Sequence, residues 1–255
     1  MVINLSNQRG WDTRQVYLSN TFVQAEIKEE VYVELTEIFR DEKNHDSKNG
    51  VVLKLNKSLY GLVQTPLYWY NQLQKGLNDI EFKDSDLEPR IYYSRGMILI
   101  TYVNDTLLFG PGIKDIEKVI SELEGKGYGI TCNEGYKTTA FDFLGVRIIH
   151  DLVTKILNLT QKKIIITFLS ANKISECNTK GSLALSTQLV TNANGPLQKK
   201  IWNYVSVIGM LMYLSSNTHP EIQFSVHQCA RFINCPREIY EEAVNHICQY
   251  LQGAK

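Results

Sequence analysis

The stretch ILITYVNDTLLFG (98–110) places the polar pair Asn104 and Asp105 between two apolar runs. The runs, 97–103 and 106–109, are rich in Ile, Leu and Val, which is typical of strands covered on at least one face. Asn and Asp tolerate the backbone conformations of tight turns. The sequence therefore predicts a β-hairpin whose two-residue turn is Asn104-Asp105.

Strand and helix patterns flank this hairpin on both sides. Pro66 stands where a first helical residue is tolerated, and apolar residues at helical spacing follow it. The predicted elements are strand 51–55, helix 66–79, strand 90–93, a helix from Ile113 to Gly125 or Gly127, and a strand pair within 139–149.

Helical patterns dominate after residue 150. Residues 164–169 fit a strand or a helix, and the turn-rich stretches 40–50 and 186–198 are expected to be loops. Three helices are predicted at about 199–215, 220–233 and from Pro236 to just before Gly253, which we expect to be a C-terminal cap. The predicted fold class is α+β, with an antiparallel sheet and flanking helices in residues 1–150 and a mainly helical region in 151–255.

The composition indicates a soluble protein of the cytoplasm or nucleus rather than a secreted or membrane protein. Of the 255 residues, 44% are apolar, yet no window reaches the roughly 18 consecutive apolar residues of a membrane span. The first residues lack the basic and apolar segments of a signal peptide. We therefore expect no membrane partner.

The charge is balanced overall and weakly divided along the chain. Residues 1–127 hold 15 basic and 19 acidic residues, and residues 128–255 hold 12 and 8, so the halves carry −4 and +4. Nucleic-acid-binding proteins usually displace counterions with a basic surface. The balance therefore argues against tight nucleic-acid binding, although a local basic groove would still permit it.

The cysteines indicate reduced thiols rather than a disulfide framework. Their number is odd and no C-x-x-C pair occurs; they are Cys132, Cys177, Cys229, Cys235 and Cys248. A zinc site would draw on the last three of them with His227 and His246. These spacings match no common zinc motif, so we expect no zinc.

Five blocks in order together resemble the reverse transcriptase domain of copia-type (Ty1-like) retrotransposon polyproteins. They are KLNKSLYGLVQTPLYWY (54–70), TYVNDTLLFG (101–110), FDFLGVRI (141–148), the segment 204–232 and QYLQGAK (249–255). The resemblance implies a polymerase palm that carries the hairpin, followed by a thumb and connection region. It also implies that the family's preceding fingers segment and following ribonuclease H domain are not part of this chain.

The resemblance further implies a phosphoryl transfer that uses two Mg²⁺ ions held by three aspartates. One aspartate belongs to an earlier strand, and aligning that block with residues 15–33 puts Tyr17 at its position. The other two form an Asp-Asp pair at the hairpin tip, where this chain has Asn104 and Asp105. Asp105 is thus the remaining metal-binding and catalytic position. Gln64 and Tyr102 fall on the nucleotide or template side, and the implied partner is an RNA/DNA template–primer.

These departures predict that the polymerase chemistry is absent. A neutral amide and a phenol with a pKa of about 10 replace two carboxylates, so most of the charge of two dications would stay uncompensated. Asp12 is five residues before Tyr17, which puts its side chain on the other face of a strand. Asp142 is in a block that resembles the primer grip, which does not ligate metal.

Further departures remove basic residues from the family pattern. Val63, Leu67 and His219 stand where the family has basic side chains. Two alternatives to an inactive remnant remain open. One is a residual DNA polymerase that uses Asp105 with Mg²⁺ or Mn²⁺, and the other is a non-catalytic module that binds nucleic acid or protein.

Three aromatic residues and two lysine pairs have both a functional and a plain interpretation. Tyr60, Trp69 and Tyr70 could stack on bases, but we expect at least two of them in the core. Lys162-Lys163 and Lys199-Lys200 could contact phosphates, but solvated surface is the expectation for both pairs.

Overall fold

The computed structural model describes most of the chain as two compact units, Met1–Thr138 and Thr139–Lys255. The described residues are 2–34, 52–132, 140–151, 154, 156–172, 178–183, 189–191, 194–199 and 202–254. The predicted loop 40–50 lies outside them, as does part of the predicted loop 186–198. Each unit is described by itself, and the palm and thumb division at residue 150 stays a prediction.

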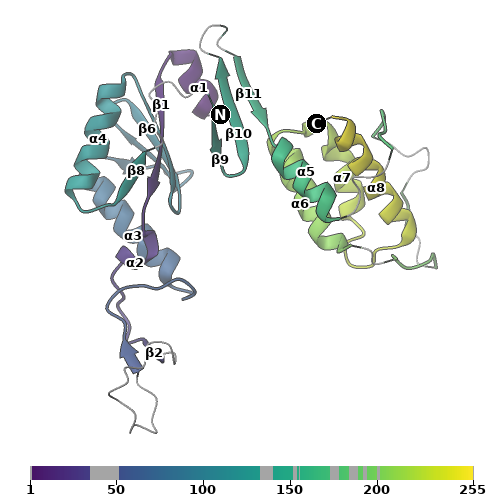
Figure 1. The fold of residues 1–255 in the computed structure, drawn as a ribbon, viewed down its shortest axis with the longest axis horizontal. Coiled ribbons are helices and arrows are strands. Elements are labelled where there is room, and N and C mark those ends of the chain that lie inside the picture. Colours follow the sequence, from purple (N-terminus) through teal and green to yellow (C-terminus); the bar gives the residue numbers. More distant parts are fainter. Residues whose placement is uncertain are drawn as a thin grey trace. The chain divides into compact units, whose positions relative to one another are not determined.

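The first unit is built on a six-stranded antiparallel sheet with the order β4-β5-β6-β7-β1-β8. Figure 1 labels β1, β6 and β8 of this sheet. Its strands are β1 (Asp12–Leu18), β4 (Lys83–Asp84), β5 (Ile91–Ser94), β6 (Met97–Tyr102), β7 (Asp105–Gly110) and β8 (Ile130–Cys132). A separate ribbon pairs β2 (Tyr32–Glu34) with β3 (Val52–Lys54). The helices are α1 (Val2–Arg9), α2 (Thr21–Gln24), α3 (Thr65–Asn78) and α4 (Ile113–Gly125).

One face of this sheet is buried against α3 and α4. Strand side chains alternate between faces, so Val16 and Leu18 of β1 share a face with Leu99 and Leu108. All four are in one buried cluster with the apolar stripes of the helices. The helical members include Trp69, Leu73 and Leu77 of α3 and Ile116, Val119, Ile120 and Leu123 of α4. Tyr17, between Val16 and Leu18, therefore points to the opposite face of the sheet.

The second unit joins a three-stranded sheet to a helical bundle. The strands β9 (Ala140–Phe143), β10 (Val146–Asp151) and β11 (Ile156–Thr160) pair in the order β11-β10-β9. The helices are α5 (Lys162–Ala171), α6 (Tyr204–Asn217), the 3-10 turn η3 (Pro220–Ile222), α7 (Gln223–Ala230) and α8 (Glu238–Gly253). Their apolar faces form one core.

The structure confirms the mixed helix and antiparallel-sheet content and corrects several bounds. Residues 164–169 belong to a helix, α5. The helix predicted from residue 199 begins at Tyr204, because the Asn203 side chain accepts a hydrogen bond from the Ser206 N–H (3.0 Å) and caps it. Gly253 is the last residue of α8 rather than its cap, which is Ala254. None of the helices in the described part is long and apolar enough to cross a membrane.

Candidate functional site

The turn between β6 and β7 consists of Val103 and Asn104, one residue earlier than predicted. Tyr102 pairs with Asp105, which makes Asp105 the first residue of β7 rather than part of the turn. Two hydrogen bonds from other elements hold this turn. The indole Nε1–H of Trp69 donates to the Val103 carbonyl (2.9 Å), and the Leu18 N–H donates to the Asn104 carbonyl (2.9 Å).

Val103 adopts a backbone conformation that its side chain disfavours. Its φ is +60°, in the left-handed region, where a β-branched residue is an outlier. Two-residue hairpin turns usually place Gly at a first position of this kind. Such strain persists only where surrounding contacts determine the conformation, and here Trp69 and Leu18 supply those contacts.

Strand pairing brings the three predicted metal positions together. Tyr17 lies directly opposite Asp105, and Asn104 precedes Asp105 in the turn. Because the Leu18 N–H bonds to Asn104, the neighbouring Tyr17–Asp105 pair is of the non-hydrogen-bonded type, in which side chains approach most closely. Residues as far apart in the sequence as β1 and β7 therefore meet at one point.

The same register extends this contact into a row across four strands. We define the tip row as Tyr102, Asp105, Tyr17 and Thr131, which are paired in that order from β6 to β8. Directly opposite residues share a face, so all four side chains are on the face away from α3 and α4. Tyr102 is 44% exposed and Tyr17 is 39% exposed.

Asp105 has an unsatisfied oxygen in this row. Its carboxylate Oδ1 is buried and has no hydrogen-bond partner in the described part of the chain. A buried polar atom of this kind is costly unless a ligand or other donor satisfies it. The side chain of Asn104 is exposed beside it. The Asp105 carboxylate therefore lies in the row between Tyr102 and Tyr17, with one acceptor oxygen unsatisfied.

The donors present do not fit two Mg²⁺ ions. The three predicted metal positions supply one carboxylate, one amide and one phenol, whereas Mg²⁺ prefers anionic oxygen ligands. Within the described ranges, no three His, Cys, Asp or Glu side chains come close enough to hold a metal ion. Asp12 is at the other end of β1, five residues before Tyr17. At the rise of a strand this separates the two residues by about 17 Å. Asp142 belongs to the other unit, where it pairs with Arg147 (2.9 Å).

Gln64 and Tyr102 occupy different surroundings. Gln64 immediately precedes α3, where its backbone carbonyl accepts hydrogen bonds from the Leu67 and Tyr68 N–H groups (3.1 and 3.2 Å). Trp69 is five residues further on, so the first turns of α3 lie beside the hairpin turn. The Arg90 guanidinium lies over the Tyr102 ring, with its Cζ 4.9 Å from the ring centroid.

The structure divides the aromatic residues that the sequence singled out. Trp69 is buried in the core, Tyr70 is half-buried, and Tyr60 is exposed beside Phe22 with a ring-centroid distance of 4.8 Å. The expectation that at least two of the three lie in the core is therefore wrong, because Trp69 alone of the three is fully buried. Sequence reasoning missed Arg90 and Thr131, which no local motif marks.

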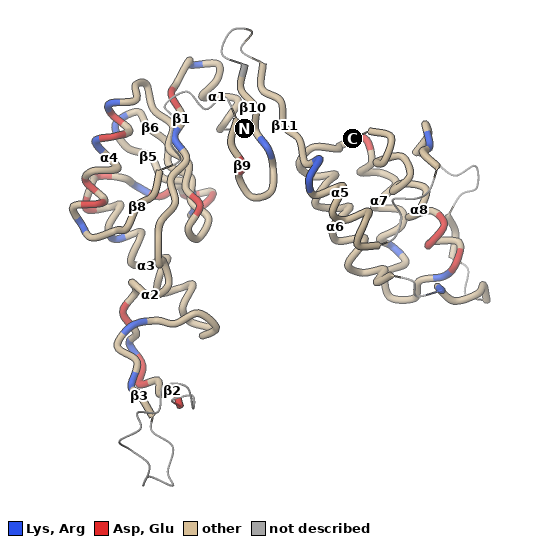
Figure 2. The backbone as a smooth tube through the Cα atoms, viewed as in Figure 1, with Lys and Arg blue, Asp and Glu red and all other residues tan. Residues whose placement is uncertain are grey.

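The basic pair Lys162-Lys163 is exposed. It lies at the start of α5, which is coloured blue in Figure 2. The candidate zinc ligands are dispersed, with Cys229 and Cys248 buried in the helical core and Cys235 exposed. Burial raises the pKa of the Cys229 thiol to about 12, so it stays neutral at physiological pH.

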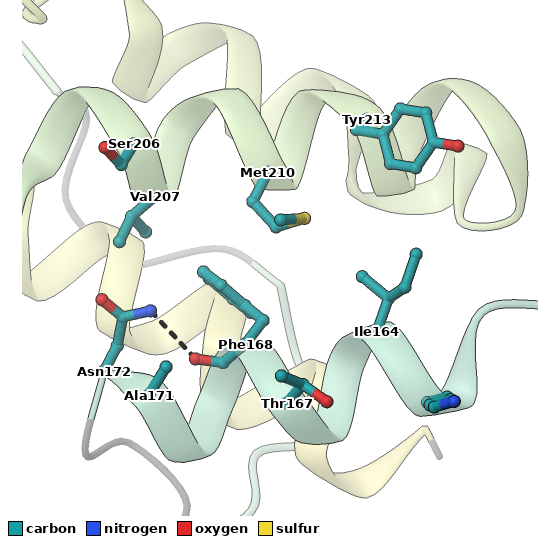
Figure 3. A pocket seen from close by; sticks show the side chains of 10 residues that line it. Ile164, Thr167, Phe168, Ala171, Asn172, Ser206, Val207, Met210 and Tyr213 are labelled. Atoms are coloured by element: carbon teal, nitrogen blue, oxygen red, sulfur yellow. Dashed lines mark hydrogen bonds between the residues drawn. The ribbon is translucent and has the colours of Figure 1, made fainter. Parts of the chain in front are cut away.

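A hollow lies between α5 and α6 in the Thr139–Lys255 unit (Figure 3). It measures about 460 Å³, and Ile164, Phe168 and Met210 contribute apolar walls. Asn172 at one end donates its Nδ2–H to the Phe168 carbonyl (2.9 Å). The polar side chains of Lys163, Ser206 and Tyr213 also line it.

Comparison with known proteins places these features in context. A family model described as reverse transcriptase (RNA-dependent DNA polymerase) matches residues 1–185. The Pol polyprotein of the tobacco transposon TNT 1-94 is 29% identical, over 99% of this chain and 19% of its own length. The transposon Ty5-1 protein of Saccharomyces cerevisiae is 27% identical, over 92% of this chain and 74% of its own length. The chain thus spans about a fifth of the tobacco polyprotein. A telomerase structure from Candida albicans is 11% identical with a TM-score of 0.31, which does not establish a shared fold.

Proposed function

The chain belongs to the reverse transcriptase family of copia-type retrotransposons, and from this premise we propose that it is a palm and thumb portion that no longer adds nucleotides. Reverse transcriptases generally use Mg²⁺, and the resemblance gives three aspartates the task of holding it. The placement of Tyr17 and Asn104 around Asp105 carries the proposal. In this arrangement the two replaced positions stand where the family's metal ligands would converge.

Charge is the physical reason for the proposed loss. A phenol with a pKa of about 10 and a primary amide are both neutral at pH 7, so Asp105 would be the only anionic ligand of the three. Nucleotide addition needs the developing charge on the attacking and leaving oxygens to be offset by metal ions. With most of the ion charge uncompensated by ligands, the metals would not be retained at the tip.

The palm and thumb assignment rests on the architecture of each unit. The first unit carries the hairpin within an antiparallel sheet covered by helices, and the second is mainly helical. The proposed partner is an RNA/DNA template–primer, with Gln64 and Tyr102 on the nucleotide or template side. Because the chain spans only a fifth of the tobacco polyprotein, the activity of that larger protein is not assigned to it.

Primer extension on a short RNA template, in Mg²⁺ and separately in Mn²⁺, tests the proposal. We compare the natural chain, Asp105→Ala, and the double variant Tyr17→Asp with Asn104→Asp. The expected result is no extension by the natural chain and extension by the double variant, which would place the defect at these two positions. Circular dichroism checks that each variant is folded.

Two outcomes would overturn it. Extension by the natural chain that disappears in Asp105→Ala would show that a single carboxylate supports a residual polymerase. No extension by a folded double variant would show that restoring both aspartates is insufficient. The loss of nucleotide addition could then not be attributed to Tyr17 and Asn104.

A further inference from the structure

The hollow between α5 and α6 is elongated and has apolar walls along its middle. It follows α5 from Lys163 to Asn172, whose positions along the helix differ by about 13.5 Å at the rise of an α-helix. Figure 3 shows Phe168 of α5 and Met210 of α6 pointing toward one another across it. A volume of about 460 Å³ stretched over this length suits a linear ligand better than a compact one.

The floor of this hollow belongs to the core of the Thr139–Lys255 unit. Phe168 and Val207 are 6% and 1% exposed, and Ile164 and Met210 pack against the same core. Their positions are therefore set by folding and not by a ligand. Small-molecule sites in proteins are typically preformed hollows of about 300–1,000 Å³ with apolar walls and a few polar groups. The α5–α6 hollow meets this description.

One end of the hollow carries an unbalanced positive charge. Lys163, in the first turn of α5, is the charged residue among those that line it. Neither Lys163 nor the adjacent Lys162 has an ion-pair partner among the described residues, and the first turn contains no acidic side chain. The helix macrodipole disfavours cations at this end of a helix. A bound anion would interact favourably with both lysines and with the dipole.

The opposite end of the hollow is neutral. Asn172 and Ser206 line it, and the Asn172 side chain already donates to the Phe168 carbonyl (2.9 Å). A ligand that fits both ends therefore has a single charged group, at the Lys163 end, and is apolar over most of its length.

We propose that this hollow binds an amphipathic monoanion, a linear alkyl chain with one carboxylate head. The tail lies between Phe168 and Met210, and the head meets the Lys163 ammonium group at the first turn of α5. This site goes beyond the proposed function, because it belongs to the Thr139–Lys255 unit and uses neither Tyr17 nor Asp105.

The lining favours an alkyl chain over a nucleotide. Nucleic acid is held by several cations that neutralise successive phosphates, whereas the hollow has one lysine. Ile164, Phe168 and Met210 give no hydrogen bond to a base edge or a sugar hydroxyl. They do favour methylene groups, since each methylene that leaves water increases the affinity.

Isothermal titration calorimetry of the full chain with octanoate, decanoate, hexadecanoate and decanol, below their micelle concentrations, tests the inference. We expect one site per chain and decanoate to bind about 15-fold more tightly than octanoate, from the burial of two more methylene groups. The gain per methylene should fall for hexadecanoate, whose extended chain is longer than the hollow. Decanol, without the charge, should bind more weakly than decanoate by at most about fivefold.

Two tryptophan variants locate the binding. Ala171 and Ser170 are both exposed on α5, but only Ala171 lines the hollow. Ala171→Trp should fill the hollow and weaken both decanoate and decanol by at least about tenfold, the loss expected when the buried methylene groups return to water. Ser170→Trp is the matched control and should change either Kd less than about twofold. Circular dichroism checks that both variants are folded.

Two charge variants test the role of the lysine. Lys163→Glu replaces an attraction by a repulsion of similar size, so it should weaken decanoate by about 5- to 25-fold and leave decanol unchanged. Lys162→Glu is the matched control, because Lys162 is exposed in the same turn but does not line this hollow. Its effect on decanoate should be clearly smaller than that of Lys163→Glu.

The inference fails if decanoate does not bind at one site, if Ala171→Trp and Ser170→Trp bind alike, or if Lys163→Glu weakens decanol as much as decanoate. A dimer in sedimentation velocity that Ala171→Trp dissociates would overturn it, since a second copy would then fill the hollow. Displacement of decanoate by a hexanucleotide would overturn it as well, because Lys163 would then serve a phosphate. None of these measurements involves primer extension, so their failure is distinguishable from failure of the proposed function.

Discussion

Two hairpin turns of the same length show different origins of structure in this chain. The β9–β10 turn is Leu144-Gly145, with φ values of +49° and +75°, and places Gly where a left-handed residue is needed. The β6–β7 turn contains no Gly and puts Val103 in the left-handed region. In the first turn, Gly145 fits one of the two left-handed positions, and the carbonyl of the left-handed Leu144 accepts a hydrogen bond from the Tyr213 hydroxyl of α6. The second turn has no glycine and depends on contacts from α3 and β1.

The β6–β7 turn stores backbone strain at Val103, beside the candidate site. Left-handed conformations cost L-residues with a Cβ about 1–2 kcal/mol, and a β-branched side chain is among the least tolerant. The Trp69 indole and the Leu18 N–H offset this cost by fixing both carbonyls of the turn. The hairpin tip is thereby held in one conformation beside Asp105.

Replacing Trp69 should produce the largest change in this comparison. The ring is buried and meets Tyr128 edge-on at 6.0 Å, so Trp69→Ala should lower the free energy of unfolding by about 3–5 kcal/mol. Trp69→Phe keeps most of the packing but removes the Nε1–H donor to Val103, with an expected loss of about 1–2 kcal/mol. Urea unfolding followed by circular dichroism measures both.

Trp11→Phe is the control for this experiment. Trp11 is half-buried at the surface beside Arg9, so its replacement should change the stability by no more than about 0.5 kcal/mol. Equal losses in Trp69→Phe and Trp11→Phe would show that the indole hydrogen bond does not hold the turn.

Gly145→Ala should destabilise the conventional turn by about 2 kcal/mol. A Cβ at this position would lie 2.7 Å from the Ile164 Cδ1 atom, and the φ of +75° is itself unfavourable for alanine. Gly209→Ala is a matched control within the same unit. Gly209 is an exposed position inside α6 with nothing within 4 Å of its added Cβ, so alanine should stabilise the chain by about 0.5–1 kcal/mol. A loss in both variants would indicate that the turn conformation is not what makes Gly145 necessary.

The two turns also show what could be predicted from sequence. The apolar runs located both strands of the β6–β7 hairpin, because a buried strand needs a run of apolar residues that is visible in the local sequence. The turn was misplaced by one residue, since Asn and Asp are better turn formers than Val and the donors that fix the turn come from distant segments. The turn propensities of residues 103–105 contain no information about a hydrogen bond donated by Trp69.

The candidate site could be predicted from the sequence only in part, because some of its members meet through distant strand pairing. Tyr17, Asn104 and Asp105 were identified by resemblance, and the register then showed two of them to be direct neighbours. Thr131 and Arg90 join them through strand pairing and ring contact, neither of which leaves a local signature. The run 164–169 was ambiguous because its five apolar residues and Thr167 fit either period, and packing against the helical core decides for α5.

Val103→Gly should change the free energy of unfolding least, and it should raise it where the Trp69 and Gly145 variants lower it. Glycine relieves the left-handed strain of about 1–2 kcal/mol but makes the unfolded chain more flexible, which costs about 0.4–1 kcal/mol. The net expectation is a stabilisation of about 0.5–1 kcal/mol in urea unfolding. Val63→Gly is the control, because Val63 is 94% exposed and its φ is not positive, so only the cost should appear. Equal destabilisation in both variants would mean that Val103 is not strained, and the contrast between the two turns would then rest on their sequences alone.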